Sequence, residues 1–382
     1  MKLNATLFYL ILISALFSYT GCRQKKRDIV FETKYKEELK KVREKEFLFM
    51  ATNQVPGASF AIVKNGELIY SEGLGMASKD LNVPATRKTK FRIGQVSELF
   101  TSLMYFLMVE EGILHPDSTV SHYFPNFPKH KYNIKLHNLV NQTSGLREPD
   151  HQEKDWRGLN VKLQQGLLNF DKDSLVFAPG AMQVLSMFNY NLLGSIMEKV
   201  NNKQFYALLE KYITDTLNLE NTVVDHPLVT IENRTDFFDY NLIAQVVHAT
   251  FRDMRYRAPS QGLLSTAEDL VKFGNAILES EYISEEIRLK LFEPVVLADG
   301  TKARMTGGWM LLQTSNNMEA RGRAGSVTGG AAALLLFPEE KLVVAGACNL
   351  TVEPEDIPVF DLARPFLSLS GKDESEKKEN AN

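Results

Sequence analysis

The sequence predicts an α+β protein in which an antiparallel sheet is built from both ends of the chain and a helical segment is inserted between them. Two apolar runs around Lys64-Asn65-Gly66 predict a β-hairpin near the N-terminus, because Asn-Gly is a strong signal for a two-residue hairpin turn. The middle of the chain is helical and rich in loops. Apolar runs separated by turn residues return after residue 305.

The first predicted element is a surface helix over residues 31–50. Charged residues there are interspersed with apolar residues at helical spacing, namely Phe31, Tyr35, Leu39, Val42, Phe47 and Met50. Pro56-Gly57 ends this helix, and the hairpin follows. The next predicted helix covers residues 100–111, an apolar stretch that ends at Gly112.

The remaining elements follow from the same signals. Helices are predicted near 190–201, near 203–214 and over 266–278, the last with Ser265 or Thr266 as its N-cap and Glu268 in its first turn. Three strands are predicted at 307–312, 331–337 and 341–350, with Pro338-Glu339-Glu340-Lys341 as the turn between the last two. A final helix is predicted at about 356–368, followed by a polar tail that is expected to be disordered.

The composition excludes several classes of protein. The 382 residues carry a net charge of −3, with 44% apolar and 24% charged residues. These values are ordinary for a globular protein and give no basic footprint for nucleic acid. The two cysteines, Cys22 and Cys348, are too few for a disulfide framework or a cysteine-type zinc site, and the seven histidines show no metal-ligand spacing. No nucleic acid, metal or cofactor is therefore expected.

Residues 1–22 have the layout of a secretory signal peptide. An apolar run, Leu7–Phe17, follows Lys2 and is shorter than the roughly 20 apolar residues that span a bilayer. The ending Thr20-Gly21-Cys22 resembles the lipobox of bacterial lipoproteins, with Tyr19 in place of the usual leucine. Lipidation of Cys22 is expected, and a plain cleaved signal or a buried apolar helix are the alternatives. Cys348 lies in the apolar run KLVVAGACNL and is expected to be a buried free thiol.

These signals give the predicted domain organisation. It consists of a signal peptide (1–22), a basic tether (23–30), one folded domain (31–370) and a disordered tail (371–382). Within the domain, a sheet subdomain is expected over about 31–90 and 260–370, and a helical subdomain over about 91–259. The tether contains Arg23, Lys25, Lys26 and Arg27, which suit a flexible stalk near anionic headgroups.

Six segments resemble, in order, the serine β-lactamase and D,D-peptidase family, with class C β-lactamases and β-lactamase-related hydrolases as the closest group. The segments are VPGASFAIVKNGELIYSEGLG, FRIGQVSELFTSLMYFLMVEEGIL, HNLVNQTSGL, APGAMQVLSMFNYNLLGSIMEKV, SQGLLSTAEDLVKFG and GRAGSVTGGAAALLLFPEEKLVV. They cover about residues 50–350. The resemblance implies a β-lactamase/transpeptidase-like fold with a cleft between its sheet and helical parts.

The resemblance also implies three catalytic elements. Ser-x-x-Lys at the start of a helix supplies the nucleophile and the base, which lie on one helix face. Tyr-x-Asn on a loop of the helical part relays a proton. Lys-Thr-Gly or His-x-Gly on a sheet edge strand holds the substrate and shapes the oxyanion hole.

This sequence departs from all three elements. Gln95-Val96-Ser97-Glu98 stands at Ser-x-x-Lys, which places Gln95 at the nucleophile and Glu98 at the lysine. An amide is not a serviceable nucleophile. Ser97 cannot substitute, because it projects about 200° away around the helix and has no lysine partner.

The other two elements are altered as well. Leu185 stands at the tyrosine and Met187 at the asparagine, whereas Arg323-Ala324-Gly325 keeps a basic residue and the glycine. The backbone N–H groups of Gln95 and Ser326 are expected to form an anion-binding notch. Gln95, Glu98, Arg323 and Ser326 are therefore the candidate ligand-binding residues, and Glu98 and Arg323 are expected to form an ion pair.

The sequence thus favours an exported, lipid-anchored homologue of serine hydrolases that has lost their chemistry and acts by binding. The expected partner is a peptidoglycan fragment, a peptide or an envelope protein, at the outer membrane or in the periplasm. The alternative is an active hydrolase of β-lactamase, D,D-peptidase or esterase type with a non-standard site.

Overall fold

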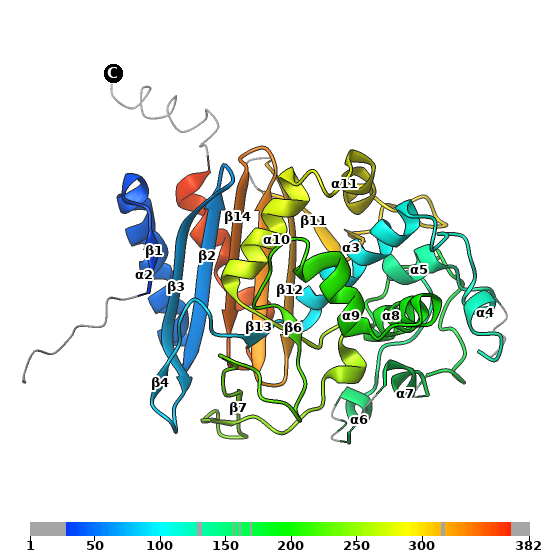
Figure 1. Cartoon of the computed structure of the whole chain (residues 1–382), viewed down its shortest axis with the longest axis horizontal. Coiled ribbons are helices and arrows are strands. Elements are labelled where there is room, and N and C mark those ends of the chain that lie inside the picture. The colour runs from blue at the N-terminus through cyan, green and yellow to red at the C-terminus, as the bar shows by residue number, and fades with distance from the viewer. Residues whose placement is uncertain are drawn as a thin grey trace, which may run out of the picture.

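The computed structural model describes residues 28–127, 132–154, 156, 158–159, 162–168, 170–314 and 318–367. The predicted signal peptide and the predicted disordered tail lie outside these residues. A twisted sheet forms one half of the body in Figure 1, and a group of helices forms the other half.

The central sheet has nine strands, and every strand pair in it is antiparallel. Its order is β1-β3-β2-β14-β13-β12-β11-β10, with β4 beside β3. The strands are β1 (Val30–Phe31), β2 (Gly57–Lys64), β3 (Glu67–Ser78), β4 (Val83–Pro84), β10 (Met305–Thr306), β11 (Trp309–Gln313), β12 (Glu319–Val327), β13 (Gly330–Phe337) and β14 (Leu342–Cys348). Both ends of the chain therefore build one sheet, and the predicted fold class is confirmed.

Two smaller sheets complete the strands. One has the order β5-β9-β6, made by β5 (Phe91–Arg92), β9 (Leu263–Ser265) and β6 (Val223–Val224). The other is a hairpin of β7 (Phe238–Tyr240) and β8 (Val246–His248). Strands therefore also occur in the stretch for which the sequence indicated helices and loops.

The α-helices are α2 (Lys36–Thr52), α3 (Ser97–Glu110), α4 (Val120–Tyr123), α5 (Leu136–Val140), α6 (His151–Lys154), α7 (Leu163–Leu167), α8 (Met187–Asn201), α9 (Phe205–Leu209), α10 (Ala267–Glu279), α11 (Glu285–Phe292) and α12 (Val359–Ala363). Short 3₁₀ turns η1 (Thr33–Tyr35), η2 (Gly94–Val96), η4 (Arg255–Arg257), η5 (Pro354–Asp356) and η6 (Arg364–Phe366) join them, and the π-helical turn η3 (Glu210–Thr214) extends α9. Helices α3 to α9 form the helical half.

The sheet is covered on both faces because its strands alternate. Ala332, Leu334 and Leu336 belong to the core shared with α3, α8 and α10, whereas Leu335 and Phe337 belong to the core shared with α2 and α12. Burial of both faces explains why the runs at 331–337 and 342–348 are almost entirely apolar.

The N-terminal hairpin forms as predicted. β2 and β3 pair, and the two turn residues Asn65 and Gly66 have φ of 52° and 78°. A two-residue turn with positive φ at both central positions matches the right-handed twist of the flanking strands. Asparagine and glycine adopt positive φ more readily than other residues, which explains Asn-Gly at this turn. The predicted N-cap Thr266 is also present, since its side chain accepts from the Asp269 N–H.

Three predicted boundaries need correction. The first helix begins at Lys36, because Phe31 pairs in β1. The buried face of this helix includes Phe49, whereas Phe47 is 51% exposed. The last predicted helix is short, with only Val359–Ala363 in α-helix between two 3₁₀ turns. The predicted tether ends before residue 30, since Asp28 forms an ion pair with Arg87. Across the described ranges, no helix combines the length and apolar character needed to span a bilayer.

Candidate functional site

Two close backbone approaches place the predicted nucleophile position against β12. η2 leads into α3, so Gln95 lies immediately before the helix and Glu98 lies in its first turn. A Cβ at Gly325 would come within 2.3 Å of the Gln95 nitrogen, and a Cβ at Gly94 would come within 2.8 Å of the Ser326 nitrogen. Glycine at both positions therefore lets the turn and the strand touch. β11 pairs only with Glu319–Gly322, so the turn lies beside the other half of β12.

The Gln95 side chain fills the expected anion-binding notch. The Ser326 N–H donates a hydrogen bond to Gln95 Oε1 at 2.8 Å. The sequence had predicted that the Ser326 N–H would be available to an anion, and this expectation is wrong because an amide oxygen of the same chain already accepts from it. A serine hydroxyl is too short to fold back in this way, whereas glutamine carries its carbonyl two carbons further from the backbone.

Glu98 and Arg323 form a buried ion pair, as expected. Arg323 Nη2 donates to Glu98 Oε2 at 2.5 Å, and the two side chains are 4% and 2% exposed. Burial raises the pKa of Glu98, and this effect outweighs the opposite effect of the Arg323 charge and of hydrogen bonds. The pair stands where the family resemblance implies a lysine facing a basic strand residue.

The guanidinium of Arg323 is only partly satisfied. Its Nη1 contacts the Met305 sulfur at 3.4 Å, and its buried Nε has no hydrogen-bond partner among the described residues. With its charge compensated by Glu98, Arg323 has lost the free positive charge that would attract a substrate carboxylate.

A buried polar network that the sequence did not reveal extends the pair into the helical half. Gln142 Nε2 donates to Glu98 Oε1 at 3.4 Å, and Gln142 Oε1 accepts from Asn189 Nδ2 at 2.6 Å and from the Ser186 N–H at 3.0 Å. Ser144 then donates to Asn189 Oδ1 at 2.5 Å. The network joins β12 and α3 to the start of α8. A positive φ of 59° at Gln142 aims its side chain inward, and no sequence spacing signals that conformation.

The residues at the Tyr-x-Asn positions contribute no polar atom to this network. Leu185 lies on the loop before α8 and is 44% exposed, and Met187, the first residue of α8, is buried. Neither side chain can transfer a proton. The adjacent Tyr190 is buried and donates to the Val140 carbonyl at 2.8 Å, and burial raises its pKa well above the usual value.

Ser97 is a structural residue. It is fully buried, and its hydroxyl oxygen accepts from the Leu263 N–H at 3.3 Å on the side of the small sheet. This contact agrees with the helical geometry, which turns Ser97 away from Gln95 and Glu98. Ser97 is therefore no substitute nucleophile.

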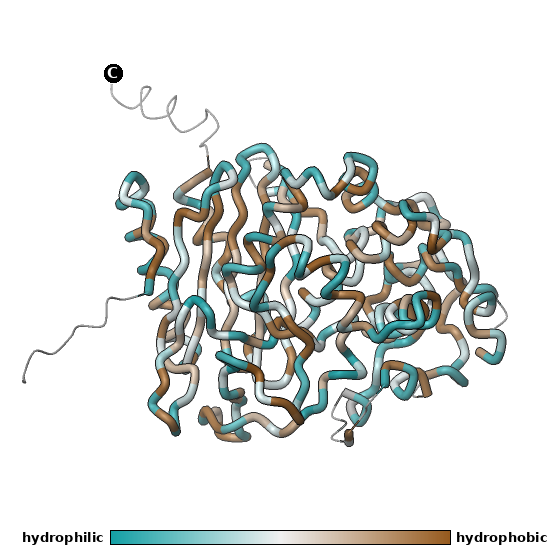
Figure 2. The backbone as a smooth tube through the Cα atoms, in the orientation of Figure 1, coloured by the Kyte–Doolittle hydropathy of each residue, from teal (hydrophilic) through white to brown (hydrophobic). Residues whose placement is uncertain are grey.

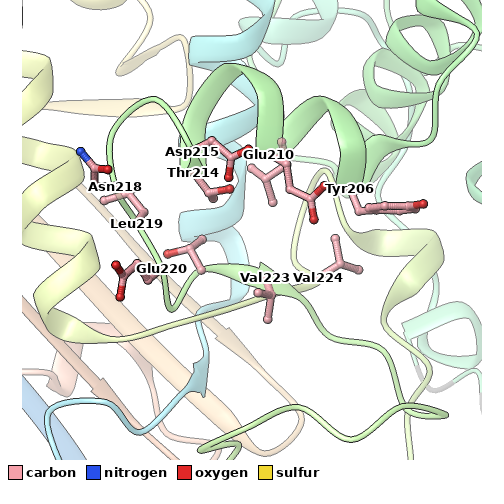
Figure 3. A pocket seen from close by; sticks show the side chains of 11 residues that line it. Tyr206, Glu210, Thr214, Asp215, Asn218, Leu219, Glu220, Val223 and Val224 are labelled. Atoms are coloured by element: carbon pink, nitrogen blue, oxygen red, sulfur yellow. The ribbon is translucent and has the colours of Figure 1, made fainter.

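The pocket drawn in Figure 3 lies apart from these residues. A cavity of about 390 Å³ is formed by α9, η3 and the segment 218–224, and the carboxylates of Glu210, Asp215 and Glu220 line it. None of the candidate ligand-binding residues takes part in it. Within the described ranges, no cluster of three histidine, cysteine or acidic side chains is placed to hold a metal ion.

The fold and the position of the site define a protein of the β-lactamase and penicillin-binding-protein class. FmtA from Staphylococcus aureus superposes with a TM-score of 0.74 at 21% identity, over 91% of this chain and 94% of that chain. An octameric penicillin-binding protein homologue from Pyrococcus abyssi gives 0.73 at 23% identity, over 85% and 77%. A class C β-lactamase gives 0.72 at 20% identity, over 88% and 97%.

Sequence comparison agrees with the fold. The family model described as Beta-lactamase matches residues 42–364, so the chain belongs to the β-lactamase family. The serine β-lactamase-like protein LACTB, mitochondrial, from Bos taurus is 26% identical, over 80% of this chain and 72% of the relative. Protein flp from Staphylococcus aureus (strain COL) is 27% identical, over 78% of this chain and 60% of the relative.

The three positions that the family resemblance marks as catalytic carry other side chains here. The nucleophile position carries an amide, the lysine position carries a paired carboxylate, and the tyrosine position carries leucine. The basic residue that remains at the Lys-Thr-Gly position, Arg323, is engaged in the ion pair with Glu98. The roles of Gln95, Glu98, Arg323 and Ser326 in ligand binding stay predictions.

Proposed function

We propose that this chain is a non-catalytic member of the β-lactamase family that acts as a binding protein in a bacterial cell envelope. The observation that carries the proposal is the hydrogen bond from the Ser326 N–H to Gln95 Oε1. One substitution thereby removes the nucleophile and also blocks the position that would stabilise a developing oxyanion.

The Glu98–Arg323 pair supports the same conclusion. A general base must be able to take a proton from a nucleophile within hydrogen-bond reach. Glu98 is buried, and its carboxylate is held by Arg323 and Gln142. The proposed ligand class is a peptidoglycan fragment, a peptide or an envelope protein, recognised without covalent chemistry.

The proposal includes export and a lipid anchor on Cys22. Support comes from the sequence alone, where an apolar run is followed by Thr20-Gly21-Cys22 and then by basic residues. A metabolic labelling experiment with a radioactive fatty acid, using the full chain expressed in a bacterium, is expected to label the wild type and leave Cys22→Ser unlabelled. Equal labelling of both chains would contradict the anchor.

The absence of catalysis is tested by hydrolysis assays. A chromogenic cephalosporin and a p-nitrophenyl ester are expected to be hydrolysed by the purified protein no faster than by a heat-denatured control. The double variant Gln95→Ser/Glu98→Lys is expected to stay slow, because Leu185 and Met187 still replace the proton relay. Robust turnover by the wild type would establish the alternative, an active hydrolase with a non-standard site.

A further inference from the structure

Three loops at one end of the body expose apolar side chains to solvent. Leu81 lies in the loop between β3 and β4 and is 76% exposed, and Leu242 and Ile243 at the tip of the β7–β8 hairpin are 106% and 73% exposed. Leu228 and Val229, on the segment after β6, are also exposed. In Figure 1 β4 and β7 lie at the lower edge, and Figure 2 shows apolar segments along the same edge. We call these five residues the apolar tips.

Contacts between the loops keep the apolar tips together. His248 on β8 bonds to Asp80 in the β3–β4 loop, with 3.0 Å between Nε2 and Oδ2. The Lys79 ammonium lies 5.7 Å from the Phe238 ring centroid on β7. These contacts join the β3–β4 loop to the β7–β8 hairpin, and Pro227, next to Leu228, lines one cavity together with His248 and Ala249. The three loops are therefore neighbours on one surface.

The hairpin itself is unusually free of charge. Residues 240–251, YNLIAQVVHATF, contain no aspartate, glutamate, lysine or arginine. Asn241 stabilises the tip from within, since its Oδ1 accepts from the Ile243 and Gln245 N–H groups. A protruding, uncharged tip that exposes leucine and isoleucine is costly in water and suits insertion into a lipid interface or a partner.

The position of the N-terminal segment favours a lipid bilayer over a protein partner as the occupant of the apolar tips. Val30 pairs with Ser71 in an antiparallel register, which places Asp28 next to Gly73 on β3. The Asp28 carboxylate forms an ion pair with Arg87, with 2.9 Å between Oδ1 and Nη2. Residues 23–27 separate Cys22 from Asp28, a link that spans at most about 20 Å. From Gly73 to Ser78, where the loop with Leu81 begins, the strand rises about 17 Å. The anchor and the apolar tips can therefore reach the same bilayer.

An arginine-lined cavity lies beside the apolar tips. It has a volume of about 390 Å³, and Arg92, Arg234 and Arg252 line it together with Asp236. Asp225 behind it binds two of these guanidinium groups, with 2.7 Å to Arg92 Nε and 2.7 Å to Arg234 Nη2. Arg92 and Arg252 are only 2% and 5% exposed, whereas the Arg234 side chain is 23% exposed. Arg234 is therefore the guanidinium that is accessible to the phosphates of anionic lipids, which also attract the basic residues after Cys22.

We propose that the apolar tips dock on an anionic bilayer and hold the body against the membrane, with the arginine-lined cavity at the level of the headgroups. The choice of a membrane as the occupant rests on the proposed lipid anchor. The docking itself depends on the folded body alone, so the unlipidated protein retains it.

The test uses the chain from Arg23 onward, which contains every described element and carries no lipid. Flotation with vesicles of phosphatidylglycerol and phosphatidylethanolamine is expected to recover the protein, and phosphatidylcholine vesicles are expected to recover much less. The variant Leu242→Gln/Ile243→Gln is expected to bind the anionic vesicles at least about fivefold more weakly. The matched control Leu289→Gln/Val296→Gln, which replaces two exposed apolar residues on and after α11, is expected to bind like the wild type.

A second measurement does not depend on the stability of the tip variant. Tryptophan fluorescence of Ile243→Trp is expected to be quenched by brominated lipids, whereas that of Leu289→Trp is not. Binding of the tip variant equal to that of the wild type, or no quenching at residue 243, would overturn the proposal. A wild-type dimer that the tip variant disrupts, without vesicle binding, would assign the surface to self-association and equally overturn it.

These outcomes are separate from those that test the proposed function. Failure of vesicle binding in a protein whose Cys22 is labelled by fatty acid would remove the docking surface and leave the anchored binding protein intact. Vesicle binding by the folded body, together with no fatty-acid label on Cys22, would remove the lipid anchor and leave the docking surface intact.

Discussion

The buried pair between Glu98 and Arg323 leads to a quantitative prediction about stability. Two unit charges about 4 Å apart attract each other by roughly 4 kcal/mol at an effective dielectric constant of about 20. Desolvation of the two nearly inaccessible side chains offsets most of this attraction. Replacing both residues by leucine is therefore expected to change the free energy of unfolding by no more than about 1 kcal/mol, or to increase it.

Removing one partner is expected to be far more costly. A single substitution leaves the other charge buried and uncompensated, which costs about 3–5 kcal/mol. Glu98→Leu is expected to be the worse variant, because it leaves the guanidinium of Arg323 buried without a compensating charge. In Arg323→Leu the carboxyl of Glu98 can take up a proton, since burial already raises its pKa. A raised folded-state pKa means that stability falls as the pH rises through it, so this variant is expected to recover at acidic pH.

The assay is a double-mutant cycle measured by urea and thermal unfolding. At about 2 °C per kcal/mol for a domain of this size, each single variant is expected to melt about 6–10 °C below the wild type. The coupling free energy is expected to be at least about 2 kcal/mol. The exposed pair Glu286–Lys290, at 2.6 Å, serves as the control and is expected to couple by less than about 0.5 kcal/mol. A coupling below about 0.5 kcal/mol for Glu98 and Arg323 would refute the reasoning.

Three further predictions address other residues. Burial raises the pKa of Glu46 to about 8, so the stability that its protonated form provides beside Tyr70 is lost as the pH rises towards 8. Relative to Glu46→Gln, the wild type is expected to lose about 3 kcal/mol of unfolding free energy between pH 6 and pH 9. The same pH dependence of unfolding free energy in both proteins would contradict this. Burial raises the pKa of the Cys348 thiol to about 11, so a thiol reagent is expected to react only after unfolding; rapid reaction of the native protein would place this thiol at the surface. Gln95→Ala frees the Ser326 N–H to water and is expected to cost about 1 kcal/mol in thermal unfolding without any gain in hydrolysis. A gain would show that the amide blocks a reaction whose nucleophile lies at another residue.

The fold was predictable where a short segment alone determines its structure. Asn65-Gly66 fixed the first hairpin, and the apolar runs at 331–337 and 342–348 identified central strands because both of their faces are buried. β12 was not separated from its surroundings as a strand, since glycine and arginine interrupt its pattern, and the β7–β8 hairpin has no Asn-Gly turn.

The site was predictable at the positions that the family resemblance fixes. The order of the flanking segments placed Gln95 near Ser326 and Glu98 near Arg323, and both contacts are present. The sequence could not show that the Gln95 amide accepts from the Ser326 N–H, because that depends on a rotamer. It also could not show Gln142, whose inward direction depends on a positive φ and on packing between loops distant in sequence.

The most direct test of the account is covalent labelling of the native protein. The chain from Arg23 onward is incubated with a fluorescent penicillin and, separately, with a fluorophosphonate, and its intact mass is measured. The account predicts an unchanged mass and no fluorescent band, because Gln95 cannot be acylated and Ser97 is buried away from the site. A stoichiometric adduct on any serine of the native protein would contradict it.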